Sequence, residues 1–531
     1  MAYVTHGARD VSWLQAGNLM SANEQEFAVW DAWYRPALRQ ARVVTYPERI
    51  TRIGNAPPRT GLAILLLAGG GLVLLTLRGV GRGRRNELLL RWPWLNAAVR
   101  GRVYPEGARV AVLAIFLLML AALAVGSSLS HRNLGSVYLW ILWWPLVPFL
   151  LFFSARSWCA VCPVATLGDM VQKLPGLGRK PAPRWLVVGG IWIIEGTFLA
   201  ITWFDRSVGL VSSVRLTLTA LLLLTGAALT VSALFRRRTF CRRLCFFGAL
   251  AGNYSMASVL ELRPRSADCM GCSRAACLRT EAAETAADGC PMLERPRSLA
   301  ANRECNLCLT CLRSCERQSL ALRVRDPLRE LAQIRRPQVA VAGLAAVLVG
   351  VVAVQNLGML EISGVLERRL GEITGLSRGP LVSLIYAAAF LLPLLLLFLA
   401  ARGDRRAFAF FGYALIPLDL GAHAAHNLLH MLGEGKSVWW VTADLLGLRS
   451  PLDIPGGHPG GSMGAALLDA STIKVLQIAL LLLAATASLA VARRLQRRMG
   501  REIGFSPLYG LLLLLVGVNL WMFWVPMALR H

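Results

Sequence analysis

Ten long apolar segments constrain this chain more than any other feature of its sequence. Each approaches the roughly 20 residues that a helix needs to cross the hydrocarbon core of a bilayer. They lie near residues 61–78, 109–128, 136–154, 185–204, 214–235, 338–358, 380–401, 408–432, 471–492 and 507–528. Hydrophobic residues make up 55% of the 531 residues, which is rare for a soluble protein of this size. We therefore expect an all-α polytopic membrane protein of about ten transmembrane helices.

The net charge of +27 comes almost entirely from arginine, and the arginines flank apolar segments. Cytoplasmic loops of membrane proteins carry an excess of arginine and lysine. The basic loops are 79–108, 155–184, 236–337, 402–407 and 493–506. This alternation predicts a multi-pass protein of the bacterial inner membrane whose cysteine-bearing stretches face the cytoplasm. A basic balance can also indicate nucleic-acid binding, but the placement of these arginines beside apolar segments argues against it.

Eight of the twelve cysteines lie in a polar insert between two groups of apolar segments, where they form two runs. The first run is Cys269-x2-Cys272-x4-Cys277-x12-Cys290, and the second is Cys305-x2-Cys308-x2-Cys311-x3-Cys315. The second spacing is typical of a [4Fe–4S] cluster, and a zinc ribbon, the main alternative, does not need so tight a run. Reducing conditions in the cytoplasm disfavour disulfides.

In two-cluster ferredoxins the fourth cysteine of each run binds the other cluster. This pattern assigns Cys269, Cys272, Cys277 and Cys315 to cluster 1, and Cys305, Cys308, Cys311 and Cys290 to cluster 2. The insert is therefore expected to be a ferredoxin-like α+β domain.

Two cysteine pairs lie upstream, each directly after an apolar segment. Cys159 and Cys162 follow the third segment, and Cys241 and Cys245 follow the fifth. Both pairs should emerge at the same face of the membrane, where four thiolates suffice for a third iron–sulfur centre. Unligated buried thiols or a redox dithiol are the alternatives.

These motifs carry a resemblance to a known family. One span is followed by the motif Trp158-Cys159-Ala160-Val161-Cys162-Pro163. Another is followed by Phe240-Cys241 and then Cys245-Phe246-Phe247-Gly248-Ala249-Leu250, and the two-cluster insert comes next. Over roughly residues 109–325 the chain resembles membrane polyferredoxins of the NapH, NosR and CcoG type. That family is linked to periplasmic nitrate reduction, nitrous oxide respiration and copper handling for cytochrome oxidase. The family has C-x3-C-P at both pairs, whereas this chain has C-x2-C-P at the first and Phe246 in place of the second proline.

The eighth apolar segment carries Asp419, His423, His426 and His430, and the three histidines fall on one helical face. Ionisable groups inside a span are costly and are often functional. Axial ligation of a b-type haem, a copper or other metal site, a quinone or proton-relay face, and plain helix–helix hydrogen bonding all fit this pattern. His131 and His458, in outer loops, are further candidate ligands. Glu195, in the fourth segment, is a second candidate for proton transfer or quinone binding.

The resulting domain plan has four parts. Residues 1–60 form an interfacial tail, 61–240 hold helices 1–5 and the first cysteine pair, 241–330 form the cytoplasmic ferredoxin-like domain with the second pair, and 331–531 hold helices 6–10 and the histidines. We predict an oxidoreductase subunit that passes electrons between a quinone pool or cytoplasmic donor, [4Fe–4S] clusters and a redox partner protein of a respiratory complex. A copper reductase or assembly factor, and a non-catalytic scaffold or redox sensor, are the alternatives.

Overall fold

The computed structural model describes most of the chain beyond residue 86. The described residues are 2–6, 9–12, 42–45, 87–101, 103–264, 269, 271–272, 277, 289–315, 317–360, 362–448, 466–500 and 507–525. The predicted first span, 61–78, and His458 lie outside them, as does most of the predicted tail. Within that tail three short strands, β1 (Ala2–His6), β2 (Arg9–Ser12) and β3 (Arg42–Thr45), form an antiparallel sheet in the order β2-β1-β3.

Nine helical segments in the described part of the chain are long and apolar enough to cross a membrane, and they coincide with nine of the ten predicted spans. They are η2 and α6 (Val103–Gly107, Ala108–Val125), α7, η3 and α8 (Leu134–Val137, Tyr138–Trp143, Trp144–Ser154), α11 (Arg184–Val208), α12 (Val214–Leu234), α18 (Val339–Met359), α20 (Arg378–Ala400), α21 (Arg405–Gly433), α23 (Ala470–Arg498) and α24 (Pro507–Trp524). Two shorter helices, α19 (Ser363–Thr374) and α22 (Lys436–Leu445), follow α18 and α21. The chain is therefore a membrane protein built mostly from helices.

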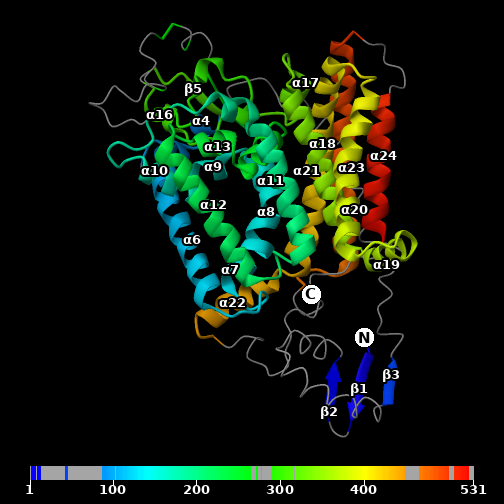
Figure 1. The fold of residues 1–531 in the computed structure, drawn as a ribbon. Helices are drawn as coiled ribbons and strands as arrows, with labels where there is room; N and C mark the ends of the chain where they lie inside the picture. Colours follow the sequence, from blue (N-terminus) through cyan, green and yellow to red (C-terminus); the bar gives the residue numbers. More distant parts are fainter. Residues whose placement is uncertain are drawn as a thin grey trace.

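The spans form two groups that pack side by side. The first group is α6, α8, α11 and α12, and the second is α18, α20, α21, α23 and α24 (Figure 1). Helix α8 contacts α21, and α11 contacts α18 and α20, so the two groups share one hydrophobic core.

Helix α21 is the central helix of the second group and is buried on nearly every side. It packs most extensively against α23 and α18. Glycines allow this close approach, because a Cβ at Gly412 would lie 2.3 Å from the Cβ of Ala342, and one at Gly421 would lie 2.1 Å from the Cβ of Ala484. Small residues at such crossings are a common feature of membrane helix packing. The aspartate and histidines of α21 are thus enclosed by protein.

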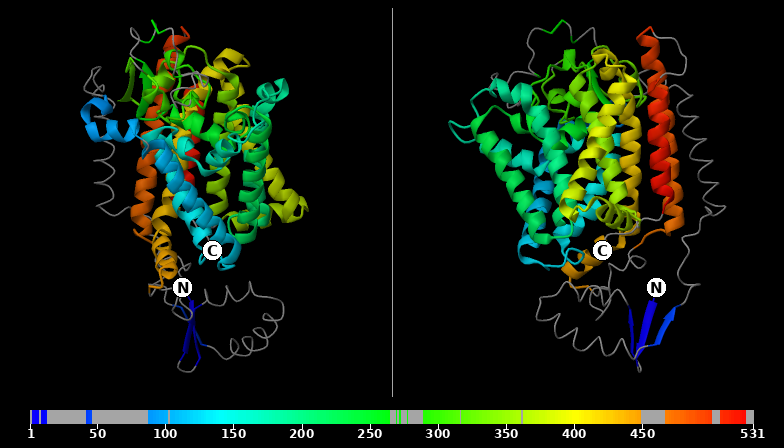
Figure 2. Two further views of the ribbon diagram at one scale, coloured as in Figure 1. Left: turned by 90° about the vertical axis from the view of Figure 1, so that its left-hand side faces the viewer. Right: turned by 45° about the vertical axis from the view of Figure 1, so that its right-hand side comes forward.

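The segments that carry the cysteines, and the short elements around them, gather at one end of the bundle, as Figures 1 and 2 show. They are α9 (Ser157–Val161), α10 (Pro163–Val171), α13 (Thr239–Arg243), α14 (Phe246–Ser255), β4 (Leu260–Pro264), η4 (Pro296–Ser298), η5 (Asn302–Glu304), α16 (Thr310–Arg313), β5 (Leu320–Val324) and α17 (Arg329–Ala332). Strands β4 and β5 pair antiparallel with Leu262 opposite Leu322, so they bring the two ends of the insert together.

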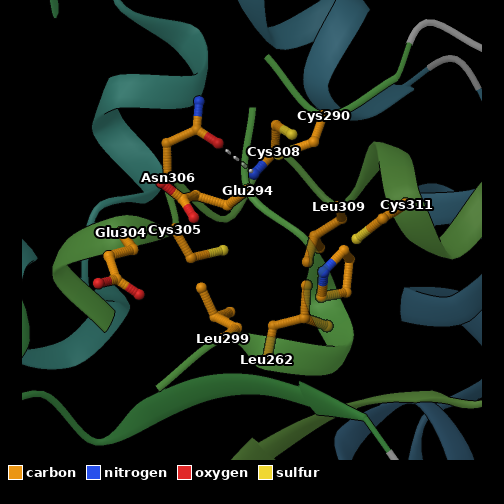
Figure 3. A pocket seen from close by; sticks show the side chains of 11 residues that line it. Leu262, Cys290, Glu294, Leu299, Glu304, Cys305, Asn306, Cys308, Leu309 and Cys311 are labelled. Atoms are coloured by element: carbon orange, nitrogen blue, oxygen red, sulfur yellow. Dashed lines mark hydrogen bonds between the residues drawn. The ribbon is translucent and has the colours of Figure 1, made fainter. Parts of the chain in front are cut away.

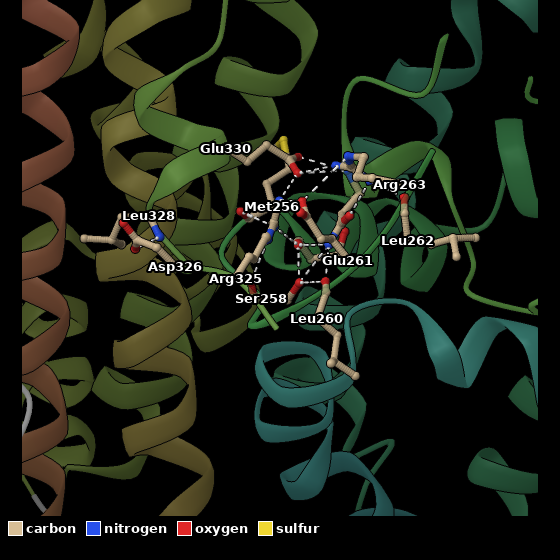
Figure 4. Close-up of polar contacts among 12 residues, drawn as sticks. Met256, Ser258, Leu260, Glu261, Leu262, Arg263, Arg325, Asp326, Leu328 and Glu330 are labelled. Carbon is tan, nitrogen blue, oxygen red and sulfur yellow. Dashed lines mark hydrogen bonds and ion pairs between the residues drawn. The ribbon is translucent and has the colours of Figure 1, made fainter. Parts of the chain in front are cut away.

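A buried ionic network fixes the insert to the bundle (Figure 4). The side chain of Arg325 is 2% exposed and pairs with the carboxylate of Glu330, which also accepts a hydrogen bond from Arg263 Nη2 at 3.1 Å. Arg325 Nη2 donates to the carbonyls of Ser255 (3.1 Å) and Met256 (2.9 Å) at the end of α14. Because the ions are paired and their remaining donors bonded, the network tolerates burial and joins strand β5 rigidly to α14 and α17.

The basic loop 79–108 has a structural role that its sequence did not predict. Its described part forms α4 (Leu88–Arg91) and α5 (Pro93–Arg100), which pack against β5 and α16. Arg323 of β5 pairs with Glu87 at 3.0 Å, and Val99 is buried in the apolar core of the insert. This segment therefore covers the insert as a cap, and we use the name cap for residues 87–101.

Candidate iron–sulfur centres

The two upstream cysteine pairs are held by the same local structure, used twice. In each pair the first cysteine lies in a five-residue helix, Cys159 in α9 and Cys241 in α13. The second cysteine is the residue that caps the start of the next helix, Cys162 before α10 and Cys245 before α14. Proline follows Cys162 at a position where its missing N–H costs nothing. Phe246 takes that position in α14, so the helix begins there without proline.

These four cysteines, from segments far apart in the sequence, lie close together. Cys162 lies within electrostatic range of Cys241 and Cys159. Cys245 lies within range of the other three cysteines of the two pairs. Because Cys162 and Cys245 both stand at helix N-termini, free N–H groups favour negative charge on their sulfurs, and Gly248 N donates to Cys245 Sγ at 3.2 Å. The arrangement suits four anionic thiolates around one cluster, and we call these residues the helix-borne centre.

A buried ion pair ties the two halves of the helix-borne centre together. Arg238 precedes Cys241 in a left-handed conformation (φ 60°) and donates to both carboxylate oxygens of Asp169 in α10, at 3.0 and 2.7 Å. Its Nη1 also donates to the carbonyl of Cys159 at 3.2 Å. Burial opposes ionisation of Asp169, but Arg238 and Arg237 outweigh it and lower the pKa of this carboxyl. Arg238 therefore fixes the position of one cysteine segment relative to the other.

Burial governs the chemistry of these thiols. It raises the pKa of Cys162 to about 12, with a further contribution from Cys241, and it also raises the pKa values of Cys241 and Cys245. Thiols of this kind hold their protons at neutral pH unless a positive centre stabilises the thiolates. Assembly of a cluster here would therefore release protons.

The insert brings its cysteines together in the two sets that their spacing predicted. Cys277 lies within electrostatic range of Cys269, Cys315 and Cys272. Cys311 lies within range of Cys308, Cys305 and Cys290. Each set therefore takes three cysteines from one run and the fourth from the other run. This geometry fits the predicted assignment of ligands to clusters, which stays a prediction.

The second set surrounds a cavity (Figure 3). Cys290, Cys305, Cys308 and Cys311 line it together with apolar residues that include Leu262, Leu299 and Leu309. Leu307 N donates to Cys305 Sγ at 3.4 Å, and Thr310 Oγ1 donates to Cys308 Sγ at 3.4 Å. Leu307 and Leu309 have positive φ angles of 48° and 59°, a backbone form that turns N–H groups towards an anion. Apolar walls and N–H···S bonds are the features by which a protein tunes an iron–sulfur cluster.

Three residues that the sequence did not single out lie between this cavity and the helix-borne centre. Tyr104 donates to the carbonyl of Leu307 at 2.8 Å and lies within electrostatic range of Cys308, Cys305 and Cys159. Arg109 Nε donates to the carbonyl of Ala160 at 2.8 Å. Arg156 is 5% exposed and donates to the carbonyl of Arg303. The partners of Tyr104 and Arg156 lie 203 and 147 residues away in the sequence, so no local motif could reveal these contacts.

The histidines of α21 make separate hydrogen bonds to separate neighbours. Tyr254 Oη lies 3.1 Å from His423 Nδ1, His426 Nδ1 lies 2.8 Å from Asn356 Oδ1, and His430 Nδ1 lies 3.5 Å from Glu434 Oε1. In the part of the chain that the structure describes, no group of three or more His, Cys, Asp or Glu side chains is arranged to hold a single metal ion. The haem, copper and quinone hypotheses for these histidines stay predictions.

Asp419 and Glu195 are also buried, at 2% and 9% exposure. Asp419 lies one helical turn before His423 on α21. Glu195 lies on α11 where that helix meets α18, with its Oε1 3.7 Å from the position that a Cβ at Gly343 would take. His131 lies in the turn between α6 and α7.

Comparisons with known proteins agree with the iron–sulfur interpretation. A family model described as a 4Fe-4S binding domain matches residues 136–181 and 217–258, which contain Cys159, Cys162, Cys241 and Cys245. The chain is also 28% identical over 193 residues to the putative electron transport protein YccM of Escherichia coli (strain K12), across 32% of this chain. The match spans 50% of the length of YccM. No solved structure matches. The chain thus carries a 4Fe–4S binding domain, and the match lies on the membrane-associated pairs rather than on the insert.

Proposed function

We propose that this chain is a membrane electron-transfer protein in which three [4Fe–4S] clusters form a series from the insert into the bundle. The observation that carries this proposal is the helix-borne centre. Four cysteines from two separate segments meet at one place, and both segments match the 4Fe-4S binding domain. The similarity to a putative electron transport protein supports the same role.

The order of the series follows from the contacts between the cysteine sets. Cys311 of the second insert set lies within electrostatic range of Cys277 of the first. Tyr104 lies within range of Cys305 and Cys308 on one side and Cys159 on the other. Electrons would therefore pass from cluster 1 to cluster 2 and on to the helix-borne centre, or in reverse.

The residues that would hold each cluster are those that the structure groups. Cys269, Cys272, Cys277 and Cys315 would hold cluster 1, Cys290, Cys305, Cys308 and Cys311 cluster 2, and Cys159, Cys162, Cys241 and Cys245 the third. Each cluster would accept and release one electron at a time. The N–H groups at Leu307, Ser319 and Gly248 donate to the cysteine sulfurs, and they would favour the more negative, reduced state.

Basic loops support a cytoplasmic position for the cluster end of the protein. The cap, the loop after α20 and the C-terminal end of α23 all carry arginine, and cytoplasmic loops are enriched in it. We propose that a cytoplasmic donor or the quinone pool of a bacterial inner membrane exchanges electrons with the series. A respiratory redox protein of the kind served by NapH-, NosR- or CcoG-type polyferredoxins would be the partner.

Iron analysis and electron paramagnetic resonance of the purified, full-length protein test the proposal. Three clusters predict about twelve iron atoms per chain, and Cys245→Ala should leave about eight. Cys305→Ala is the matched comparison, since it should remove a different cluster with a different signal. About eight iron atoms in the wild type would contradict the third cluster. Failure of both a quinol and a low-potential reductant to reduce the clusters would contradict the electron-transfer role.

A further inference from the structure

The polar face of α21 contains buried atoms that its protein neighbours do not satisfy. Asp419 and His423 are 2% and 3% exposed. Among the described residues, Nε2 of His423 has no hydrogen-bond partner, and the carboxylate of Asp419 has none apart from the Tyr254 hydroxyl, which lies close to it and also bonds to His423 Nδ1. Unpaired buried polar groups are expensive, and ionisable groups within a membrane span are more so. Two such groups one helical turn apart indicate a site that takes up a small polar species.

This site lies beside the helix-borne centre. Tyr254, which bonds to His423, lies in the last turn of α14, the helix whose N-terminus Cys245 caps. The ring of Trp144 lies 6.2 Å from that of His423. Its neighbour Trp143 contacts Trp158, which precedes Cys159, with ring centroids 5.4 Å apart. Both halves of the helix-borne centre are thus connected to the site by packed aromatic side chains.

Further polar side chains lie on the same face of α21, between the site and α22. The rings of His426 and His430 lie 5.2 Å apart, edge to face. His426 contacts Asn356 of α18, and His430 faces Glu434 near the end of α21. Side chains of this type exchange protons and hydrogen bonds along a helix face. They provide a path from the end of the bundle opposite the insert.

We propose that Asp419, Tyr254 and His423 form a proton-uptake site coupled to reduction of the helix-borne centre. This inference rests on the proposed function. When the centre accepts one electron from cluster 2, one proton from water enters along His430 and His426 and binds at Asp419. When the electron leaves, the proton is released. The electron comes from the reduced donor of the series, and no other bond is made or broken.

The elements packed against α21 are η3, α8, α14, α18, α20, α23 and α24. Their titratable side chains are Tyr138 on η3, Tyr254 on α14, Arg378 and Tyr386 on α20, Lys474, Arg493, Arg494, Arg497 and Arg498 on α23, and Tyr509 on α24. Helix α21 itself carries Arg405, Arg406, Tyr413, Asp419, His423, His426 and His430, and Glu434 follows directly after it. Lys474 is directed away, with Nζ 2.7 Å from the carbonyl of Trp524. Arg238, paired with Asp169, lies beside the helix-borne centre, so an added electron there is offset only in part and still favours a proton at Asp419.

The test is a redox titration of the intact protein in nanodiscs, followed by electron paramagnetic resonance between about pH 6 and pH 8. In the wild type, one of three midpoint potentials should fall by about 59 mV per pH unit, which is one proton per electron. Asp419→Asn should abolish the slope, and Tyr254→Phe should reduce it. Tyr386→Phe, a buried tyrosine of α20 away from the site, should retain it. A pH-indicator measurement on the wild type should detect about one proton taken up on reduction, which requires no variant.

The outcomes separate this inference from the proposed function. Three clusters whose potentials are all independent of pH would overturn the proton site and leave the electron series intact. An unchanged slope in Asp419→Asn would overturn the role of this carboxyl site. About eight iron atoms in the wild type would overturn both proposals, since the centre to which the proton is coupled would not exist.

Discussion

The helix-borne cysteines and the insert cysteines are held in contrasting ways. Cys159, Cys162, Cys241 and Cys245 lie in or directly before helices, and the Arg238–Asp169 pair fixes the helices to each other. The insert cysteines lie mostly in turns between two short strands, and their apolar surroundings are small. We infer that the protein preorganises the first set without a cluster, whereas the insert depends on its clusters for order. Substitutions in both regions can break or sharpen this contrast.

The largest effect on iron content and folding is expected when one cysteine is removed from the insert or from the helix-borne centre. Cys305→Ala and Cys245→Ala should each lower the iron content by about four atoms per chain. Only Cys305→Ala should also expose the β4–β5 sheet to hydrogen exchange, because a cluster contributes the folding energy of a small domain. Equal protection of that sheet in both variants would contradict the contrast.

Asp169→Asn tests the Arg238–Asp169 ion pair, which joins the two cysteine segments of the helix-borne centre. The side chain of Arg238 is 3% exposed, and loss of its partner leaves a buried charge unpaired. We expect a loss of about 3 kcal/mol, measured as a lower thermal midpoint, with early loss of the third cluster. Glu372→Gln is the control. Glu372 (63% exposed) pairs with Arg369 (75% exposed), so its loss should change stability by less than about 0.5 kcal/mol.

The same Arg238–Asp169 ion pair predicts that the stability of the protein depends on pH. Arg238 and Arg237 lower the pKa of Asp169 against the opposing effect of burial. A lowered pKa contributes stability that is present above the unfolded value of about 3.9 and is lost as the pH falls through the folded value. The difference in thermal midpoint between the wild type and Asp169→Asn should therefore be full at neutral pH and shrink below about pH 4. A constant difference across this range would contradict the assignment.

Substitutions at two glycines of α14 form a matched pair, and their expected effects are of intermediate size. A Cβ at Gly248 would lie 2.8 Å from the backbone oxygen of Cys241, whereas one at Gly252 meets nothing nearer than 3.6 Å. Gly248→Ala should cost about 2 kcal/mol and perturb the signal of the third cluster. Gly252→Ala should leave that signal intact and stabilise the helix by up to about 1 kcal/mol. The same spectrum in both variants would place the third cluster elsewhere.

The smallest effect concerns the cap. Glu87→Gln weakens the pair with Arg323, whose side chain is 33% exposed, and should cost about 1 kcal/mol. Limited proteolysis should then cut residues 88–100 faster, while the helix-borne centre keeps its potential. A shift of that potential would show that the cap acts on both regions.

Local patterns predicted most of the elements and the cysteine sets. Apolar length located nine spans. The two sets of insert cysteines are predicted from their spacing together with the ligand pattern of two-cluster ferredoxins, and the structure brings members of each set near one another. Contacts between distant segments could not be predicted in this way. Tyr104 at Leu307 and Tyr254 at His423 depend on how the helices pack, and neither tyrosine stands in a motif. The sequence predicts only a basic loop at the cap, because the partners of α4 and α5, strand β5 and helix α16, lie more than 200 residues later in the chain.

The cap also has a consequence for biosynthesis. Glu87 and Arg323 are separated by 236 residues, so the cap leaves the ribosome long before its partner strand is made. During translation at about 5–20 residues per second, the insert emerges while the first spans are already in the membrane. Because the cap packs against β5, it cannot close until β5 is made. Closure of the cap would then mark the end of cluster loading.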